Sequence, residues 1–214
     1  MMVGTQNAGV ELVNQLTRGL EKYGKGQTDI QRFSNSFFES AEIDDLESLP
    51  EDLLVKITID AFDYIQSRSA NSHKIRAFDI SVETGNGKAD TRTVIEILND
   101  DMPFLVDSIM GELQEQHLHI HQIMHPILYT ERKNSGEMVA VLDEEAIGHD
   151  GYMGKPEGFS RESFIHIQME AVSDQRKKDI ATTISAILEN VRLSVADWRS
   201  MLHLVSTIGD EYTR

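Results

Sequence analysis

Residues 91–128 (TRTVIEILNDDMPFLVDSIMGELQEQHLHIHQIMHPIL) constrain the fold more than any other part of this 214-residue chain. Residues 93–98 form a short apolar run that only Glu96 interrupts, which predicts a well-buried strand. An acidic turn follows, then a segment with apolar residues at helical spacing, then a second apolar run that ends just after Pro126. A strand, a helix and a strand of this length predict the first half of a βαβ or split βαβ unit.

The acidic turn consists of Asn99, Asp100, Asp101, Met102 and Pro103. Asp101 is a suitable helix N-cap, and Pro103 suits the first turn of a helix, where a missing N–H costs nothing. The predicted helix then carries apolar side chains on one stripe, at Val106, Ile109, Met110 and Leu113, and it ends near residue 117.

Helical patterns dominate the first 72 residues. Apolar spacing predicts a helix over residues 9–23, Thr28 is a good N-cap for a second helix over residues 28–40, and Pro50 predicts the start of a third. Residues 74–83 then alternate with the period of a strand, and the glycines of residues 85–87 predict a turn. We therefore expect a helical N-terminal subdomain over residues 1–72 and a second domain over residues 73–214.

Strands and one long helix are predicted after the central stretch. Residues 134–136 (NSG) predict a hairpin turn, and residues 138–142 predict a short strand. A Gly-rich segment over residues 143–160 predicts an exposed loop, and residues 163–172 predict another strand. An apolar stripe over residues 180–205 predicts a long helical region, in which a break near residues 192–194 is an alternative. This order predicts an α+β fold of the ferredoxin-like kind, an antiparallel sheet with helices on one face.

The composition excludes several classes of function. The chain has no cysteine, which excludes a disulfide framework, thiolate catalysis and cysteine-ligated zinc. With 36 acidic and 20 basic residues the net charge is −16, which disfavours nucleic acid as a partner. No apolar run approaches the roughly 20 residues that cross a bilayer, and the N-terminus lacks a signal-peptide pattern. We expect a cytoplasmic protein with no membrane contact.

No motif of a nucleotide-binding or nucleophilic enzyme is present. The glycines near residue 86 lack the Lys-Ser/Thr of a phosphate loop, and GxGxxG is absent. Adjacent carboxylates such as Asp100 and Asp101 are expected to point apart, and no serine has the context of a nucleophile. We expect no catalytic residue and no cofactor within this chain.

Four histidines follow the predicted helix, at His117, His119, His121 and His125. Residues two apart on a strand share a face, so His119, His121 and His125 are candidate metal ligands, and His166 on a neighbouring strand is a further candidate. The alternative is a set of ordinary hydrogen-bonded histidines on a sheet face. Clustered histidines can also respond to pH.

The acidic turn is the second candidate site. Asn99, Asp100, Asp101, Met102 and Pro103 lie between the end of a strand and the start of a helix, where exposed backbone N–H groups bind carboxylates or phosphates. The alternative is that these residues only cap the helix.

The segments NDDMPFLVDSIMGEL and HIHQIMHPIL resemble the N-terminal region of the large bacterial NAD-specific glutamate dehydrogenases. The resemblance extends to ESLPEDLLVKITIDAFDYIQSR, SFIHIQMEAV and ILENVRLSVADWRSML, and so spans residues 33–201. It implies ACT-like domains, and a parent enzyme that uses NAD to oxidise glutamate to 2-oxoglutarate and ammonia. The catalytic and NAD-binding domains of such an enzyme lie far C-terminal to this region.

The resemblance implies a regulatory module that binds an amino acid or a related small effector at residues 98–102, attached to the catalytic domains of the same chain in a homo-oligomer. A structural module that positions or oligomerises the catalytic domains without a ligand is the alternative. A metal-dependent protein that uses His119, His121 and His125 is a third hypothesis, from a different class.

Overall fold

The structure, a computed structural model, describes residues 16, 18–20, 27–41, 46, 49–83, 89–142 and 159–212, with side chains described up to residue 197. The predicted loop over residues 143–158, the turn over residues 84–88 and most of the predicted helix over residues 9–23 lie outside the described residues. The named helices are α2 (Gln27–Glu39), α4 (Glu51–Ile65), α5 (Leu105–Glu115) and α7 (Asp174–Tyr212). The strands are β1 (Lys74–Glu83), β2 (Ala89–Asp100), β3 (Ile120–Met124), β4 (Ile127–Arg132), β5 (Met138–Leu142) and β6 (Phe159–Glu170).

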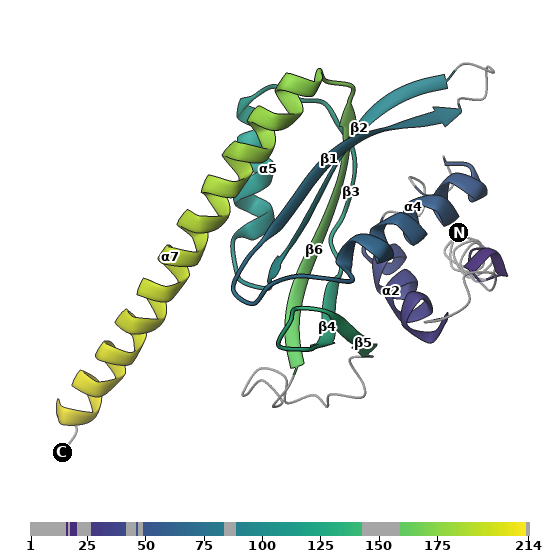
Figure 1. Ribbon diagram of the computed structural model, residues 1–214. Coiled ribbons are helices and arrows are strands. Elements are labelled where there is room, and N and C mark those ends of the chain that lie inside the picture. The colour runs from purple at the N-terminus through teal and green to yellow at the C-terminus, as the bar shows by residue number, and fades with distance from the viewer. Residues whose placement is uncertain are drawn as a thin grey trace, which may run out of the picture.

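One antiparallel sheet forms the centre of the molecule (Figure 1). The strand order is β1-β2-β6-β4-β5, and β3 also pairs with β6. β3 and β4 therefore lie end to end along the same edge of β6. His125 and Pro126 separate the two strands. The β4–β5 hairpin then extends the sheet by one short strand.

The order β1-β2-β6-β3 reproduces a ferredoxin-like sheet with one change of connection. In a βαββαβ unit the fourth strand follows the second helix and lies beside the first strand. Here the second helix is α7, and the place beside β2 is occupied by β1, which comes before the unit in sequence. The predicted ferredoxin-like fold is confirmed, although its edge strand comes from the N-terminal side.

Helices α5 and α7 cover one face of the sheet (Figure 1). This face is apolar because alternate residues of β2 and β6 are aliphatic, which places one continuous stripe toward the helices. The cluster is made by Ile95, Ile97, Ile165, Ile167 and Met169 of the sheet and by Leu105, Ile109, Leu113, Ile180, Ile184 and Leu188 of the helices. The predicted antiparallel sheet with α5 and α7 on one face is confirmed.

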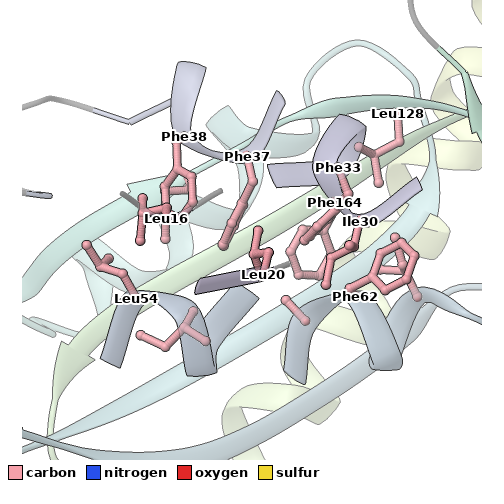
Figure 2. Packing of buried hydrophobic residues seen from close by; sticks show 14 of the residues in the cluster. Leu16, Leu20, Ile30, Phe33, Phe37, Phe38, Leu54, Phe62, Leu128 and Phe164 are labelled. Carbon is pink, nitrogen blue, oxygen red and sulfur yellow. The ribbon is translucent and has the colours of Figure 1, made fainter. Parts of the chain in front are cut away.

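Helices α2 and α4 cover the opposite face of the same sheet. Phe33 and Phe37 stack at 5.2 Å between ring centroids, and both contact Phe164 of β6 at 5.7 Å (Figure 2). Leu54 and Phe62 of α4 belong to the same cluster. These aromatic side chains are therefore packing residues that join the helical layer to the sheet.

The predicted start of the helix after the acidic turn is wrong. Helix α5 begins at Leu105, so Asp101 is not its N-cap and Pro103 lies in the turn before it. Its N-cap is Phe104, which makes no side-chain capping hydrogen bond. No break occurs near residues 192–194, because α7 is one helix of 39 residues.

Candidate functional site

The predicted ligand loop begins at Asn99, the last fully buried residue of β2. The Asn99 Oδ1 atom accepts a hydrogen bond of 3.1 Å from an Nη2–H of Arg192 on α7. The Arg192 Nη1 group also donates to the Asn71 carbonyl oxygen. The Asn99 Nδ2 amide and the Arg192 Nε–H are buried and have no hydrogen-bond partner, so two neighbouring donors lack an acceptor.

Asp100 belongs to a buried ion network. An Nη2–H of Arg68 donates to Asp100 Oδ1 at 2.6 Å and to Glu162 Oε1 at 2.6 Å. Arg132 donates to both oxygens of the Glu162 carboxylate, at 2.8 Å to Oε1 and at 2.7 Å to Oε2. Burial alone lowers the pKa of Arg68, but the Glu162 and Asp100 carboxylates outweigh burial and raise it. The ion pair between Asp100 and Arg68 therefore connects the end of β2 to the residues after α4.

The next loop residues reach a different strand and then solvent. Asp101 binds Arg161 of β6 twice, because its backbone N–H donates to the Arg161 carbonyl at 2.9 Å and its Oδ2 lies 3.2 Å from Arg161 Nε. Met102 is partly buried against the α5–α7 side of the core. Pro103 is exposed. The five predicted residues thus run from the end of β2 into the turn before α5, and the first three contact three different parts of the fold.

Phe104 was missed by the sequence prediction. Its φ is +70°, a left-handed conformation that is rare for an aromatic residue, and its side chain is 65% exposed. The sequence signal was its place just before the stripe of Val106 and Ile109, where a large apolar residue has no core position to occupy.

A groove begins at Phe104 and runs between α5 and α7, with a volume of about 540 Å³. Its α5 wall includes Asp107, Glu112 and Glu115, and its α7 wall includes Val191. The groove lies on the outer surface of the two helices, away from the sheet.

The structure separates the predicted histidine ligands. The rings of His119 and His121 lie 4.8 Å apart, whereas His125 Nε2 lies 2.7 Å from Ser163 Oγ. His166, the suggested further ligand, is fully buried, and its Nδ1 lies 2.9 Å from Glu96 Oε1. Within the described ranges, no group of three or more His, Cys, Asp or Glu side chains could hold a metal ion. Burial lowers the pKa values of both His121 and His125.

A second buried polar cluster, around Glu96, was also missed. Glu96 accepts from Arg76 Nε at 2.6 Å as well as pairing with His166, and it is fully buried between the sheet and α4. Burial raises the pKa of nearby Tyr64, and the charge of Glu96 adds to the effect. Glu96 as the lone charge in a buried strand was the sequence signal, because a buried charge needs a partner.

The loop therefore combines charges rather than presenting a free nucleophile or acid. Four guanidinium groups, from Arg68, Arg132, Arg161 and Arg192, meet three carboxylates at this end of the sheet. Arg192 is the one of the four with no carboxylate partner among the described residues. Such an arrangement can bind an anion and can couple neighbouring elements.

In the part of the chain that the structure describes, no helix is long and apolar enough to span a bilayer.

Comparison with known proteins agrees with the fold. A sequence model described as "Glutamate dehydrogenase, ACT1 domain" matches residues 33–184. The chain is 27% identical over 202 residues to an NAD-specific glutamate dehydrogenase of Halomonas elongata, covering 93% of this chain and 12% of that protein. It is 26% identical over 178 residues to the NAD-specific glutamate dehydrogenase of Pseudomonas aeruginosa, covering 83% of this chain and 10% of that protein.

The chain spans about a tenth of the length of these relatives. No solved structure matches it. The family match covers all the named elements from α4 to β6, and it includes the loop, the groove and the Glu96 cluster in part or whole. The chain belongs to the family of the glutamate dehydrogenase ACT1 domain.

Proposed function

We propose that this chain is a non-catalytic regulatory module of a large NAD-dependent glutamate dehydrogenase, and that it binds a small effector at Asn99, Asp100, Asp101, Met102 and Pro103. The parent enzyme would oxidise L-glutamate to 2-oxoglutarate with NAD. NAD and the catalytic residues would belong to other domains of the same chain. The names of the two relatives support this parent enzyme.

The observation that carries the effector proposal is the unmatched positive charge beside the loop. Arg192 hydrogen-bonds only neutral oxygens, and its Nε–H lacks an acceptor, as does Asn99 Nδ2. A guanidinium group and an amide donor together suit a carboxylate, since charge-assisted hydrogen bonds are the strong ones. An amino acid also carries an ammonium group, which Asp100 or Asp101 would attract. The effector class is therefore an amino acid or a related carboxylate.

The contacts of these residues also support a role in transmitting effector binding. Asn99 contacts α7, Asp100 contacts Arg68 after α4, and Asp101 contacts β6. An effector carboxylate that takes hydrogen bonds from Arg192 would weaken the link between β2 and α7. A ligand shifts an equilibrium only when it makes different contacts in the two states, and this link supplies such a difference.

Calorimetry and thermal unfolding against the amino acids and 2-oxoglutarate test the proposal. We expect at least one compound to bind the wild-type chain and raise its unfolding temperature. Arg192→Gln should weaken that binding by about tenfold or more, because it removes the charge-assisted bonds. The matched control is Arg176→Gln on the same helix, which should bind normally. No response to any compound at millimolar concentration would count against effector binding.

A structural module that positions the catalytic domains or oligomerises the enzyme is the second candidate. It is supported by α7, whose C-terminal half extends well beyond the sheet and α5 (Figure 1). A ligand-free module of this kind predicts that Arg192→Gln leaves the effector response of the full enzyme unchanged. It also predicts that deleting residues 198–212 changes the oligomeric state in light scattering.

A further inference from the structure

The groove between α5 and α7 lies outside the proposed effector contacts. One side of α5 supplies its wall from Phe104 to Glu115, and the lining residues recur at the three- and four-residue spacing of a helix face: Phe104, Asp107, Ser108, Gly111, Glu112 and Glu115. That stripe is roughly 16 Å long at the rise of an α-helix. The α7 side adds Ile187 and Val191. A groove of this length between two antiparallel helices has the shape that accepts a third helix.

Gly111 leaves the middle of the groove open. A Cβ atom added at Gly111 would meet no other atom within 4 Å, so the position is not needed for packing inside the domain. Glycine weakens a helix interior, and its presence here has no internal explanation in the described structure. A partner backbone could approach α5 closely at this point.

Phe104 stands at one end of the groove as an exposed aromatic anchor. Its left-handed backbone and 65% exposure are both unfavourable in the isolated domain. Aromatic side chains are enriched in the buried centres of protein interfaces, where they carry much of the binding energy. A partner that covers Phe104 would bury the apolar surface that the domain leaves in water.

The charge of the groove selects the partner. Asp107, Glu112 and Glu115 line it, the lining contains no basic residue, and these three acids form no ion pair among the described residues. A second copy of this chain, with a net charge of −16, would bring like charge to the same surface. We propose that the α5–α7 groove is the docking site of a cationic amphipathic helix, with apolar side chains on Phe104 and Val191 and Lys or Arg beside the three acids.

The test uses the 214-residue chain and a labelled helical peptide of leucine and lysine with one apolar stripe. Fluorescence anisotropy should show saturable binding of one peptide per chain that weakens as salt is added. A peptide of the same composition in scrambled order, and one with glutamate in place of lysine, should bind at least about tenfold more weakly. Equal binding of the scrambled peptide would overturn the proposal, because it would show attraction by net charge alone.

Two pairs of variants locate the binding. Gly111→Trp adds a large side chain to the groove lining at a position where an added Cβ meets nothing within 4 Å, and Gln114→Trp places the same side chain on an exposed position of α5 outside the lining. We expect only Gly111→Trp to weaken binding, by about tenfold or more. Circular dichroism of both variants checks that they fold, and Phe104→Asn supplies a second groove variant that suits a left-handed backbone.

A second comparison measures peptide binding by two triple variants that have the same net charge. One is Asp107→Asn with Glu112→Gln and Glu115→Gln, and the other neutralises Glu51, Asp52 and Glu83, which lie elsewhere. Binding should weaken only in the first. Equal loss in both variants would overturn the proposal. So would a concentration-dependent dimer in sedimentation that Gly111→Trp abolishes, since the occupant would then be a second copy.

Discussion

The two faces of the central sheet are built from the same strands but by different interactions. Toward α5 and α7, β2 and β6 present aliphatic side chains such as Ile97 and Ile167. Toward α2 and α4 the same strands present Glu96, Glu162 and His166, all fully buried, among apolar residues. One face is held by packing, whereas the other combines packing with buried charge.

The difference indicates what each face specifies. Aliphatic side chains pack in many registers, so the α5–α7 face favours burial without fixing which residues pair. On the other face Glu96 lies directly opposite His166, and Asp100 lies directly opposite Glu162, in the β2–β6 pairing. A shift of two residues would separate Glu96 from His166, and it would move Asp100 away from Glu162, with which it shares Arg68. The polar face therefore fixes the register, whereas the apolar face contributes packing alone.

The largest effect is expected from Glu162→Ala on the polar face. This change would leave Arg68 and Arg132 buried without their shared carboxylate, which costs about 3–5 kcal/mol when one partner of a buried pair is removed. Urea unfolding measures the loss. Glu137→Ala is the control, because the Lys133–Glu137 pair is exposed and should contribute under about 0.5 kcal/mol. Similar losses in both variants would mean that burial of the network does not matter.

Ile167→Ala tests the apolar face and should cost about 3 kcal/mol, through lost burial and the cavity it leaves. Val139→Ala, at a half-exposed position, should cost under about 0.5 kcal/mol. Hydrogen exchange should show that Ile167→Ala loosens the sheet with its register intact. New strand pairing in Ile167→Ala would contradict the division of roles between the faces.

A double-mutant cycle on Glu96 and His166 is expected to give an intermediate effect. Glu96→Leu alone leaves the His166 Nδ1–H buried without an acceptor, which costs about 1–3 kcal/mol. The double variant with His166→Leu removes both polar groups, and such replacements are often neutral or stabilising. Arg76 keeps its surface partner Asp60 in either case. Additive losses in urea unfolding would show that the pair is not coupled.

The sequence predicted the apolar face better than the polar face. The alternation of apolar and polar residues over 163–172 predicted β6, and the apolar run over residues 93–98 predicted β2. Both predictions were possible because the burial of strand residues is visible in the order of apolar residues along the sequence. The ferredoxin-like class followed from the order of these elements. β1 pairs with β2, the strand that follows it in the chain. The pairing of β2 with β6 could not be predicted, because these strands are far apart along the chain and no local pattern links them.

The candidate site was predicted as a set of residues but not as a geometry. Asn99, Asp100 and Asp101 are adjacent in sequence, whereas their partners Arg192, Arg68 and Arg161 are far away along the chain. No local pattern links such partners. The prediction that Asp101 caps α5 failed because Arg161 binds Asp101 and the chain turns through Phe104 before the helix begins.

The smallest expected effect is a dependence of stability on pH that His125 contributes beside the loop. Burial lowers the pKa of His125 in the folded chain, although the nearby Asp101 carboxylate opposes the shift. The unfolded chain, with an imidazole pKa of about 6.5, therefore takes up a proton first as the pH falls. The contribution is complete above about pH 6.5 and is lost as the pH falls below that value.

His125→Asn should reduce the loss of stability between about pH 7 and pH 5.5, because the titrating group is gone. The control is His117→Asn, at an exposed position with φ of +56°, where asparagine suits the left-handed backbone. Urea unfolding at several pH values compares the variants, and His121, whose pKa is also lowered by burial, keeps part of the dependence in both. If His125→Asn and the wild type lose stability in parallel, the imidazole beside Ser163 is not a source of pH dependence.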